Sequence, residues 1–130
     1  MHIDPVVQRM LEAERSGREV GLRVISASDG GAVAELEVTP EMANGFEVAQ
    51  GGFTFMLADQ AFACAANTVL PGAATVDASI TFLAPAEVGT TLVAEARTFF
   101  TDGRRVIVDV VVRDGERSIA LFRGTGRALR

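Results

Sequence analysis

The chain has 130 residues, 48% of them hydrophobic, and a formal net charge of −5 at pH 7. This is enough apolar sequence for one domain, which we expect to span residues 1–130, and the acidic balance argues against a nucleic-acid-binding surface. With Cys64 as the only cysteine and His2 as the only histidine, the composition excludes an internal disulfide and disfavours a Cys–His catalytic pair or a metal site.

The N-terminal segment predicts a short helix within residues 1–17. Asp4 and Pro5 suit the N-cap and the first helical position, and Ser16-Gly17 ends the pattern. The segment lacks the basic and apolar regions of a signal peptide, so we expect a cytoplasmic protein that is not bound to a membrane.

Two strands are predicted next, over residues 20–27 and 31–38, joined by the hairpin signal Ser28-Asp29-Gly30-Gly31. Residues 41–50 then form a polar loop that includes Asn44 and Gln50. Its polar side chains and its glycine suit contact with a ligand, although an ordinary connecting loop can have the same composition.

The longest apolar segment follows Gly51 and predicts a central helix over residues 52–69. Apolar residues occupy almost all of its helical positions, which indicates a helix that is buried on nearly every side. Its content of Asp, Gln and Asn is too high for a membrane span.

Asp59 is an acid in the middle of this helix. The residues three and four positions away are all apolar, namely Phe55, Met56, Phe62 and Ala63. Burial among them should remove water from the carboxylate and raise its pKa, which makes Asp59 a candidate catalytic group. The alternative is a structural acid held in an ion pair.

Four more strands are predicted after the helix, over residues 75–83, 91–101, 104–113 and 116–128. Two Asp-Gly turns join the last three strands into an antiparallel meander. A largely antiparallel sheet that carries one apolar helix must curl around that helix to cover it. We therefore predict an α+β domain with the hotdog fold, preceded by the short N-terminal helix.

The segment from Asn44 to Asp59, with the sequence NGFEVAQGGFTFMLAD, closely resembles the signature of the PaaI-like hotdog thioesterases. These are the acyl-CoA thioesterases of phenylacetate degradation and their relatives. Residues 75–86 are similar to the strand that follows the helix in that family, and Gly124-Thr125-Gly126 is similar to part of its last strand. The likeness covers the chain from about residue 20 onwards.

The resemblance implies hydrolysis of an acyl-CoA thioester without a cofactor, because coenzyme A is part of the substrate. It makes Asp59 the catalytic acid and Gly51 the source of the amide that polarises the thioester carbonyl. It makes Asn44 a polar group at the substrate, and Thr75 a hydroxyl that holds the attacking water or the acid. Where the family usually has His, this chain has Gln50, which forms hydrogen bonds but cannot carry a proton charge.

The residues themselves suit this chemistry. A helix N-terminus offers free N–H groups and a positive dipole end, and glycine lets a carbonyl oxygen approach the backbone closely. Asp59 would act as a general base on water or as a nucleophile that forms a mixed anhydride, and the sequence leaves both open.

The spacing of the two main groups adds a constraint. Gly51 and Asp59 would lie about 12 Å apart along one helix, so they can act on one thioester only from different subunits. We therefore predict a homodimeric site with Asn44, Gln50 and Gly51 from one chain and with Asp59 and Thr75 from the other. The family suggests a tetramer of two such dimers.

The resemblance also suggests where the rest of the substrate lies. Family sites for coenzyme A use basic residues near the last hairpins, which points to Arg104 and Arg105, although a solvated basic turn is the alternative. Phe82 and Pro85 would lie near the pantetheine path. The acyl group, aryl-acetyl or a short or medium chain, would lie against apolar side chains of the central helix and the loop before it. Phe46, Phe53 and Phe62 are the candidates, although each ring taken alone fits the hydrophobic core better.

Two other functions compete with that of a thioesterase. A non-catalytic acyl-CoA binder or sensor has the same fold, and Gln50 keeps this alternative open. A hotdog dehydratase is disfavoured because such enzymes need a His–Asp or His–Glu pair, whereas His2 lies in the terminal segment.

Overall fold

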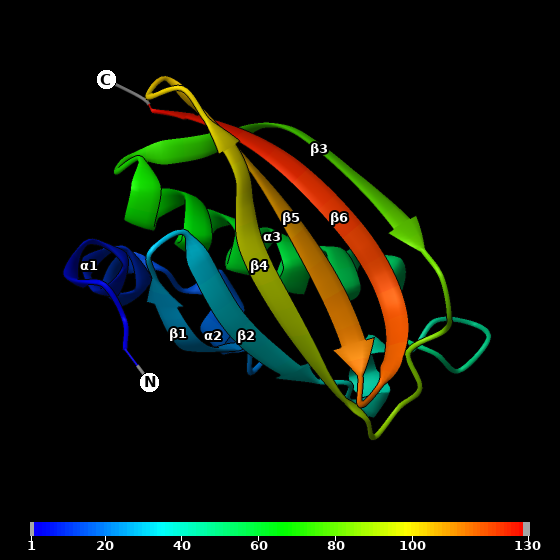
Figure 1. Cartoon of the computed structure of the whole chain (residues 1–130). Coiled ribbons are helices and arrows are strands. Elements are labelled where there is room, and N and C mark those ends of the chain that lie inside the picture. The colour runs from blue at the N-terminus through cyan, green and yellow to red at the C-terminus, as the bar shows by residue number, and fades with distance from the viewer. Residues whose placement is uncertain (1, 129–130) are drawn as a thin grey trace.

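The protein is described from a computed structural model, which covers residues 2–128. Six antiparallel strands form one sheet that curls around the long helix α3 (Gly51–Val69), and the short helix α1 (Pro5–Ala13) lies beyond one edge of the sheet (Figure 1). The predicted α+β architecture, with an antiparallel sheet around a central apolar helix, is confirmed.

The order of strands in the sheet is β1-β2-β4-β5-β6-β3. The last three strands in the chain form the predicted meander. A short 3-10 helix, η1 (Pro40–Met42), lies between β2 and α3. The strand bounds are β1 (Arg23–Ser28), β2 (Gly31–Glu37), β3 (Ala73–Phe82), β4 (Thr91–Thr101), β5 (Arg105–Asp114) and β6 (Arg117–Ala128).

The N-terminal helix differs from the prediction at its end. It begins as expected, with the Asp4 carboxylate accepting a hydrogen bond from the N–H of Val6 at 2.8 Å, but it stops at Ala13 because Glu14 is extended. A separate helical turn, α2 (Ser16–Glu19), follows. The prediction that Ser16-Gly17 ends the first helix is therefore wrong, since these residues begin the second.

The core lies between α3 and the inner face of the sheet. The helix presents small side chains there, and β5 presents a row of fully buried valines, Val106, Val108, Val110 and Val112. Alanines such as Ala58, Ala61 and Ala65 let the helix lie close to these branched side chains. This close packing explains why the apolar pattern of residues 52–69 predicted the helix correctly, one residue short of its start at Gly51.

Phe62 is the largest fully buried side chain, and β6 leaves space for its ring. A Cβ on Gly124 would come within 2.8 Å of the Phe62 ring, and one on Gly126 within 3.3 Å. These glycines therefore serve the packing of Phe62. Because this ring is 1% exposed, its predicted place in the acyl pocket is wrong.

The two edges of the sheet are not equivalent. The edge at β1 is covered by the N-terminal segment, where the N–H of Ala27 donates to the carbonyl of His2 at 2.9 Å. The outer edge of the ten-residue strand β3 has no neighbouring strand within residues 2–128. β3 contains no Pro, Lys or Arg, which are the residues that usually discourage pairing with another chain.

Across residues 2–128, no helix is both long and apolar enough to cross a membrane. In the same range, no three His, Cys, Asp or Glu side chains lie close enough together to hold a metal ion.

Candidate active site

Asp59 lies in the third turn of α3 and is half-buried. Desolvation by its surroundings raises the pKa of its carboxyl group above 3.8, as the sequence predicts, and the nearby Glu14 carboxylate raises it further. A hydrogen bond from Thr75 acts in the opposite direction. Within residues 2–128 no arginine forms an ion pair with Asp59, so the structure does not support the reading of Asp59 as an ion-paired structural acid.

Thr75 is brought to Asp59 by an irregularity in β3. Its hydroxyl donates to Oδ1 of Asp59 at 3.2 Å. The register of β3 against β6 shifts between Thr75 and Asp77, which is a β-bulge around Val76. Because of this extra residue, Thr75 shares the inner face with Ile80, five positions later, although strict alternation would place the two on opposite faces.

Gly51 is the first residue of α3, and Gln50 is its N-cap. The N–H groups of Gly51 and Gly52 have no intrahelical acceptor, because the first N–H groups of any helix lack one. The Gln50 side chain is exposed and makes no capping hydrogen bond to the helix. Only Gly51 of the two lines the groove described below, so its N–H is the one that is free to bind an oxygen atom of a ligand.

Asn44 organises the loop before α3. Its Oδ1 accepts hydrogen bonds from the N–H of Phe46 at 2.8 Å and of Val48 at 3.4 Å. Because a backbone N–H can only donate, the amide oxygen must face the loop, and the NH2 group of Asn44 is left to donate elsewhere.

A groove lies beside the start of α3. Its volume is about 410 Å³, and its walls include Gly51, Thr54, Phe82, Leu83, Pro85 and Ala86. The ring of Phe82 is half-exposed and lies directly over Gly51. The structure thus brings together Gly51, Phe82 and Pro85, three of the residues that the sequence pointed to.

The predicted site residues form two separate groups in one chain. Thr75 and Asp59 lie near the beginning of β3, whereas Phe82 and Gly51 lie at its end. Thr75 and Phe82 are seven positions apart along the strand, which is roughly 20 Å. Since α3 is continuous from Gly51 to Val69, the expected separation of about 12 Å between Gly51 and Asp59 is retained.

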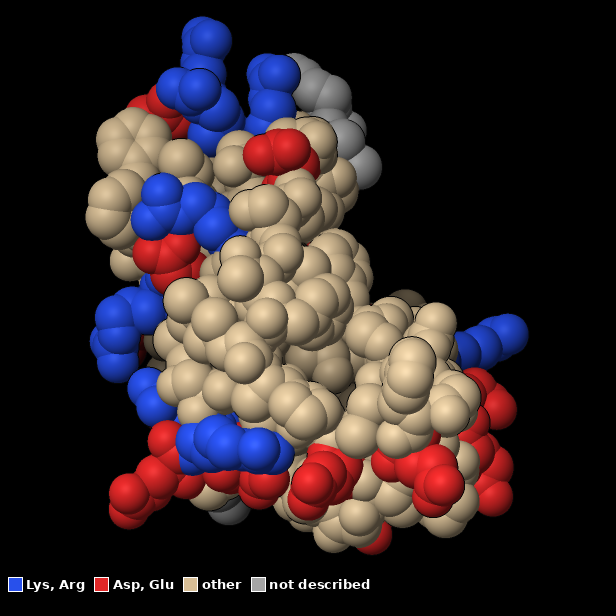
Figure 2. All heavy atoms as spheres, turned by 90° about the vertical axis from the view of Figure 1, so that its right-hand side faces the viewer, with Lys and Arg blue, Asp and Glu red and all other residues tan. Residues whose placement is uncertain are grey.

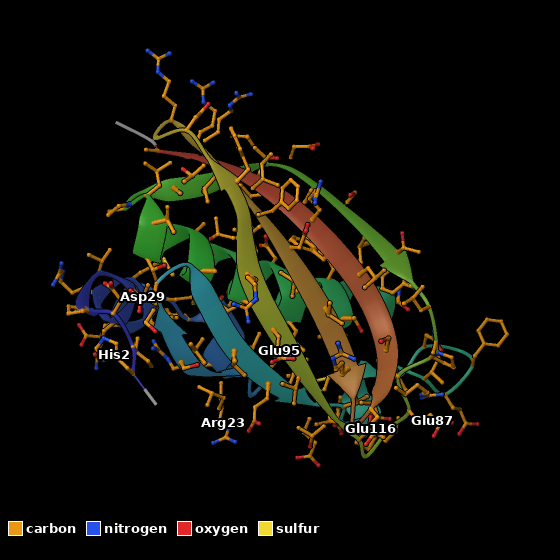
Figure 3. The ribbon with its side chains drawn as sticks, in the orientation of Figure 1. His2, Arg23, Asp29, Glu87, Glu95 and Glu116 are labelled. Carbon is orange, nitrogen blue, oxygen red and sulfur yellow. The ribbon has the colours of Figure 1, made fainter. Side chains whose placement is uncertain are left out.

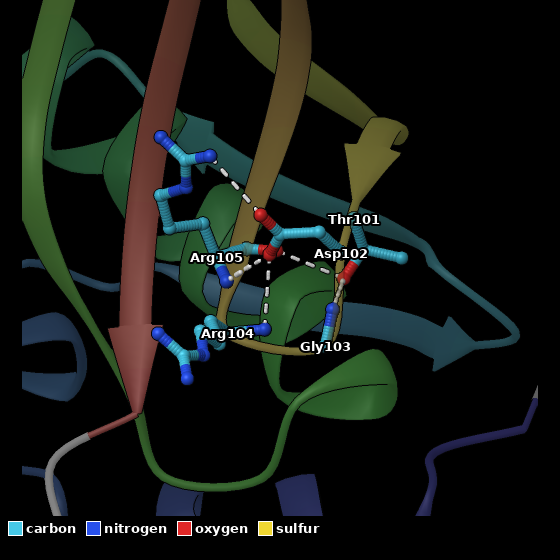
Figure 4. Close-up of polar contacts among 5 residues, drawn as sticks. All are labelled: Thr101, Asp102, Gly103, Arg104 and Arg105. Carbon is cyan, nitrogen blue, oxygen red and sulfur yellow. Dashed lines mark hydrogen bonds and ion pairs between the residues drawn. The ribbon is translucent and has the colours of Figure 1, made fainter.

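Arg104 and Arg105 lie at the hairpin between β4 and β5, at the Thr75 end of the sheet (Figure 4). Asp102 accepts hydrogen bonds from both backbone N–H groups, and its carboxylate pairs with the Arg105 guanidinium at 3.0 Å. These bonds hold the pKa of Asp102 well below its usual range. The Arg104 guanidinium has no ion-pair partner within residues 2–128.

Two further phenylalanines had been expected near the acyl group. Phe46 lies at the tip of its loop and is 87% exposed, and Phe53 is partly buried and lines a different cavity, against α2 and η1. His2 lies beside α1, on the opposite side of the molecule from Glu87, whose loop pairs with the segment before α3 (Figure 3). His2 therefore lies far from the start of α3.

The sequence reasoning missed three features of this region. It did not find the bulge at Val76, the proximity of Glu14 to Asp59, or the support of the groove by Arg117, whose guanidinium donates to the Pro85 carbonyl at 2.8 Å. A signal for the bulge is present, because the apolar alternation of residues 78–82 is out of phase with Ala73.

The curled sheet around α3, with an acid inside the helix and glycine at its start, matches a known class. The profile of the thioesterase superfamily matches residues 46–120. The chain belongs to this superfamily, as a hotdog-fold member of its PaaI-like group of acyl-CoA thioesterases.

Individual relatives make the assignment more specific. The acyl-coenzyme A thioesterase PaaI of Escherichia coli K12 is 35% identical over 116 residues, covering 88% of this chain and 83% of that protein. The structure of E. coli PaaI, from the phenylacetic acid degradation operon, has a TM-score of 0.90 and 32% identity, over 95% of this chain and 90% of that one. A Streptococcus mutans protein solved with acetyl-CoA has a TM-score of 0.78 and 25% identity, over 84% of this chain and 89% of that one.

Proposed function

We propose that the protein hydrolyses an acyl-CoA thioester to a free acid and coenzyme A. The observation that carries this proposal is the half-buried Asp59 carboxylate, which has a raised pKa and a hydroxyl partner, in a homologue of an acyl-CoA thioesterase. A carboxylate that is poorly hydrated but still accessible is a stronger base than one in water, and it fits general-base or nucleophilic attack.

The catalytic groups come from two chains. Asp59 and Gly51 of one chain are too far apart to act on one carbonyl, and Thr75 and Phe82 mark opposite ends of β3. If β3 pairs antiparallel with β3 of a second copy, the start of one strand lies beside the end of the other. Asp59 and Thr75 of one subunit then face the Gly51 groove of its partner.

The face that includes the edge of β3 fits such a partner. Val76 and Phe82 are exposed there, and so is Leu83, which follows the strand. Figure 2 shows uncharged residues across the middle of this face, with basic side chains at the top and down the left side and acidic side chains mainly at the bottom. A two-fold axis would place the basic end of each copy next to the acidic end of the other, which favours the antiparallel arrangement.

In the proposed reaction, the thioester oxygen lies against the N–H of Gly51 at the positive end of α3. Donors placed in advance for a developing oxyanion contribute about 3 to 4 kcal/mol each to lowering the barrier. Asp59 of the other subunit either removes a proton from water or attacks the carbonyl itself, and Thr75 orients its carboxylate. The exposed Gln50 side chain, directly before Gly51, and the NH2 group of Asn44, earlier in the same loop, are the further donors that we propose for the substrate.

We place the coenzyme A chain in the groove formed by Phe82 and Pro85 of one subunit. Its phosphates then point toward the hairpin of Arg104 and Arg105 of the other subunit, because that hairpin lies at the Thr75 end of the sheet, which the antiparallel pairing brings beside the groove. Arg104 is the better phosphate ligand of the two, because the guanidinium of Arg105 is already paired with Asp102. The Streptococcus mutans relative was solved with acetyl-CoA, which supports a ligand of this class.

The acyl group fits a cavity of about 160 Å³ between α3 and the N-terminal helices. Its walls combine the apolar side chains of Leu11, Leu22 and Val24 with Gln60, which follows Asp59 in the chain, and with the charged residues Glu14 and Arg18. A cavity of roughly 150 Å³ holds benzene in another protein, so an aryl-acetyl group or a short aliphatic chain is the expected size. We expect this reaction to take place in the cytoplasm.

The test is release of free thiol from a panel of acyl-CoA compounds, with wild type and Asp59→Asn compared. Turnover that falls at least about 100-fold in the variant supports the proposal. Binding without thiol release would instead identify a non-catalytic acyl-CoA sensor, which the replacement of the usual His by Gln50 leaves open. In that case Gln50→His is expected to restore turnover.

The two-chain site has its own test. Asp59→Asn and a variant blocked at Gly51 are each expected to be inactive alone. Mixed after dissociation and reassembly, they should form hybrids with one intact site and recover up to about half of the wild-type rate per hybrid dimer. If the mixture stays inactive although hybrid dimers form, both groups belong to one chain and the arrangement is wrong.

A further inference from the structure

Asn67 is a buried polar residue in the last two turns of α3, and it is 4% exposed. Its Nδ2 donates to the carbonyl of Ala63 at 2.9 Å and to that of Ala73 at 3.0 Å, and its Oδ1 accepts from the N–H of Gly72 at 2.8 Å. Because carbonyls only accept and N–H groups only donate, these bonds fix the orientation of the amide.

Two of these hydrogen bonds cross from the helix to the beginning of β3. α3 ends at Val69, and the chain reverses through Gly72, whose φ is +86°, before β3 starts at Ala73. Asn67 therefore fixes the point from which the strand leaves the helix. Thr75 is the second residue after that point.

The contact between Thr75 and Asp59 is sensitive to the position of the strand. Its length of 3.2 Å is already long for a hydrogen bond between a hydroxyl and a carboxylate. A displacement of a few tenths of an ångström would break it. The bulge at Val76 follows at once and separates Thr75 from the rest of β3. Thr75 is therefore held by the short stretch of pairing from Ala73 to Thr75 against β6 and by the turn before it, which Asn67 binds.

We propose that Asn67 is a positioning residue, which holds the start of β3 through Gly72 and Ala73 and thereby keeps the Thr75 hydroxyl on the Asp59 carboxylate. Asp59 and Asn67 lie two helical turns apart on α3, and the turn and strand close the loop back to Asp59. The catalytic consequence rests on the proposed function, whereas the structural link does not.

The link predicts a change at Asp59. Desolvation raises the pKa of Asp59, and the hydrogen bond from Thr75 lowers it. The carboxylate of Glu14, which is the charged group that acts on Asp59 within the described residues, raises it as well. Loosening the start of β3 removes the Thr75 contribution, so the pKa of Asp59 rises further. A purely structural asparagine would affect folding without moving this titration.

The experiment titrates the Asp59 carboxyl carbon by NMR in the full-length protein. We expect Asn67→Ser to raise the midpoint by roughly 0.5 to 1 pH unit, in the same direction as Thr75→Val. Serine can still bond the carbonyl of Ala63 but is too short to reach β3, so this variant disturbs folding less than Asn67→Ala. In the double variant, the shift should not exceed that of Thr75→Val alone.

Thr68→Val is the matched control. Thr68 is the next residue of the same helix end, and its hydroxyl donates to Ala65 at 2.7 Å and accepts from the N–H of Gly30 at 2.7 Å. It ties α3 to the β1–β2 turn instead of to β3. We expect this variant to lose stability while the titration of Asp59 stays in place.

An unchanged midpoint in Asn67→Ser, a full addition of its shift to that of Thr75→Val, or an equal shift in Thr68→Val would overturn the proposal. The pH profile of kcat/KM is then read separately. If the Asp59 midpoint moves and the acid limb of the profile does not, the role of Asn67 stands and the proposed catalytic role of Asp59 fails.

Discussion

Replacing Gly51 by alanine tests the proposed carbonyl site directly. The added Cβ would lie 3.0 Å from Cζ and 3.4 Å from Cε1 of Phe82, closer than the 3.5 to 4.0 Å of ordinary carbon contacts. Because the Phe82 ring is 52% exposed, it can move aside. Alanine is also favoured over glycine within a helix by about 0.5 to 1 kcal/mol, so we expect the free energy of unfolding to change by less than about 1 kcal/mol.

The effect on activity should be much larger. The methyl group would stand where the thioester oxygen has to approach the Gly51 N–H, and the displaced ring would narrow the groove. Alanine keeps the backbone N–H, but a thioester oxygen that cannot reach it has in effect lost this donor. Losing one donor to an oxyanion typically lowers kcat about 100- to 1000-fold, and we expect a loss of that size.

Gly52→Ala provides the matched control, since a Cβ on Gly52 would meet nothing within 4 Å. Thiol release by both variants is measured under steady-state conditions, and denaturant unfolding checks their stability. The control should keep its kcat within about threefold of wild type. A Gly51→Ala variant that keeps a similar rate, or an equal loss in Gly52→Ala, would refute the assignment of the carbonyl site.

Three other outcomes are expected. Because the reaction should require ionised Asp59, whose pKa is raised in the folded protein, the acid limb of the pH profile of kcat/KM should have its midpoint above pH 3.8. A midpoint below pH 3.8 contradicts this. Gly124→Ala should lower the free energy of unfolding by about 1 to 3 kcal/mol, since its Cβ would overlap the ring of Phe62. In the double variant with Phe62→Leu, the total loss should be smaller than the sum of the two single losses, and a simple sum would show that the two side chains do not clash. Arg104→Ala should raise KM for an acyl-CoA about fivefold, which is a larger increase than Arg105→Ala should cause, and this increase should be smaller at high salt. If both variants raise KM equally and salt has no influence, neither arginine binds the phosphates.

Local patterns account for most of the fold. The apolar run after Gly51 predicted the buried helix, and the Asp-Gly pairs at residues 102–103 and 114–115 predicted the meander, because each depends on neighbours in the chain. The end of the N-terminal helix was missed, since Ser16-Gly17 suits a helix start as well as a helix end.

The sequence by itself also determined that the carboxyl group of Asp59 is poorly hydrated and has a raised pKa, because an acid among apolar helical neighbours loses water wherever that helix is buried. What it could not determine was how groups far apart in the chain meet. The bulge at Val76, the turn held by Asn67 and the ring of Phe82 over Gly51 all depend on strand register and on packing between elements. Such contacts have no local periodicity. The family resemblance pointed to Thr75 as a partner of Asp59, but only the tertiary structure shows that the bulge and the turn bring its hydroxyl to the carboxylate while Gly51 lies at the far end of β3.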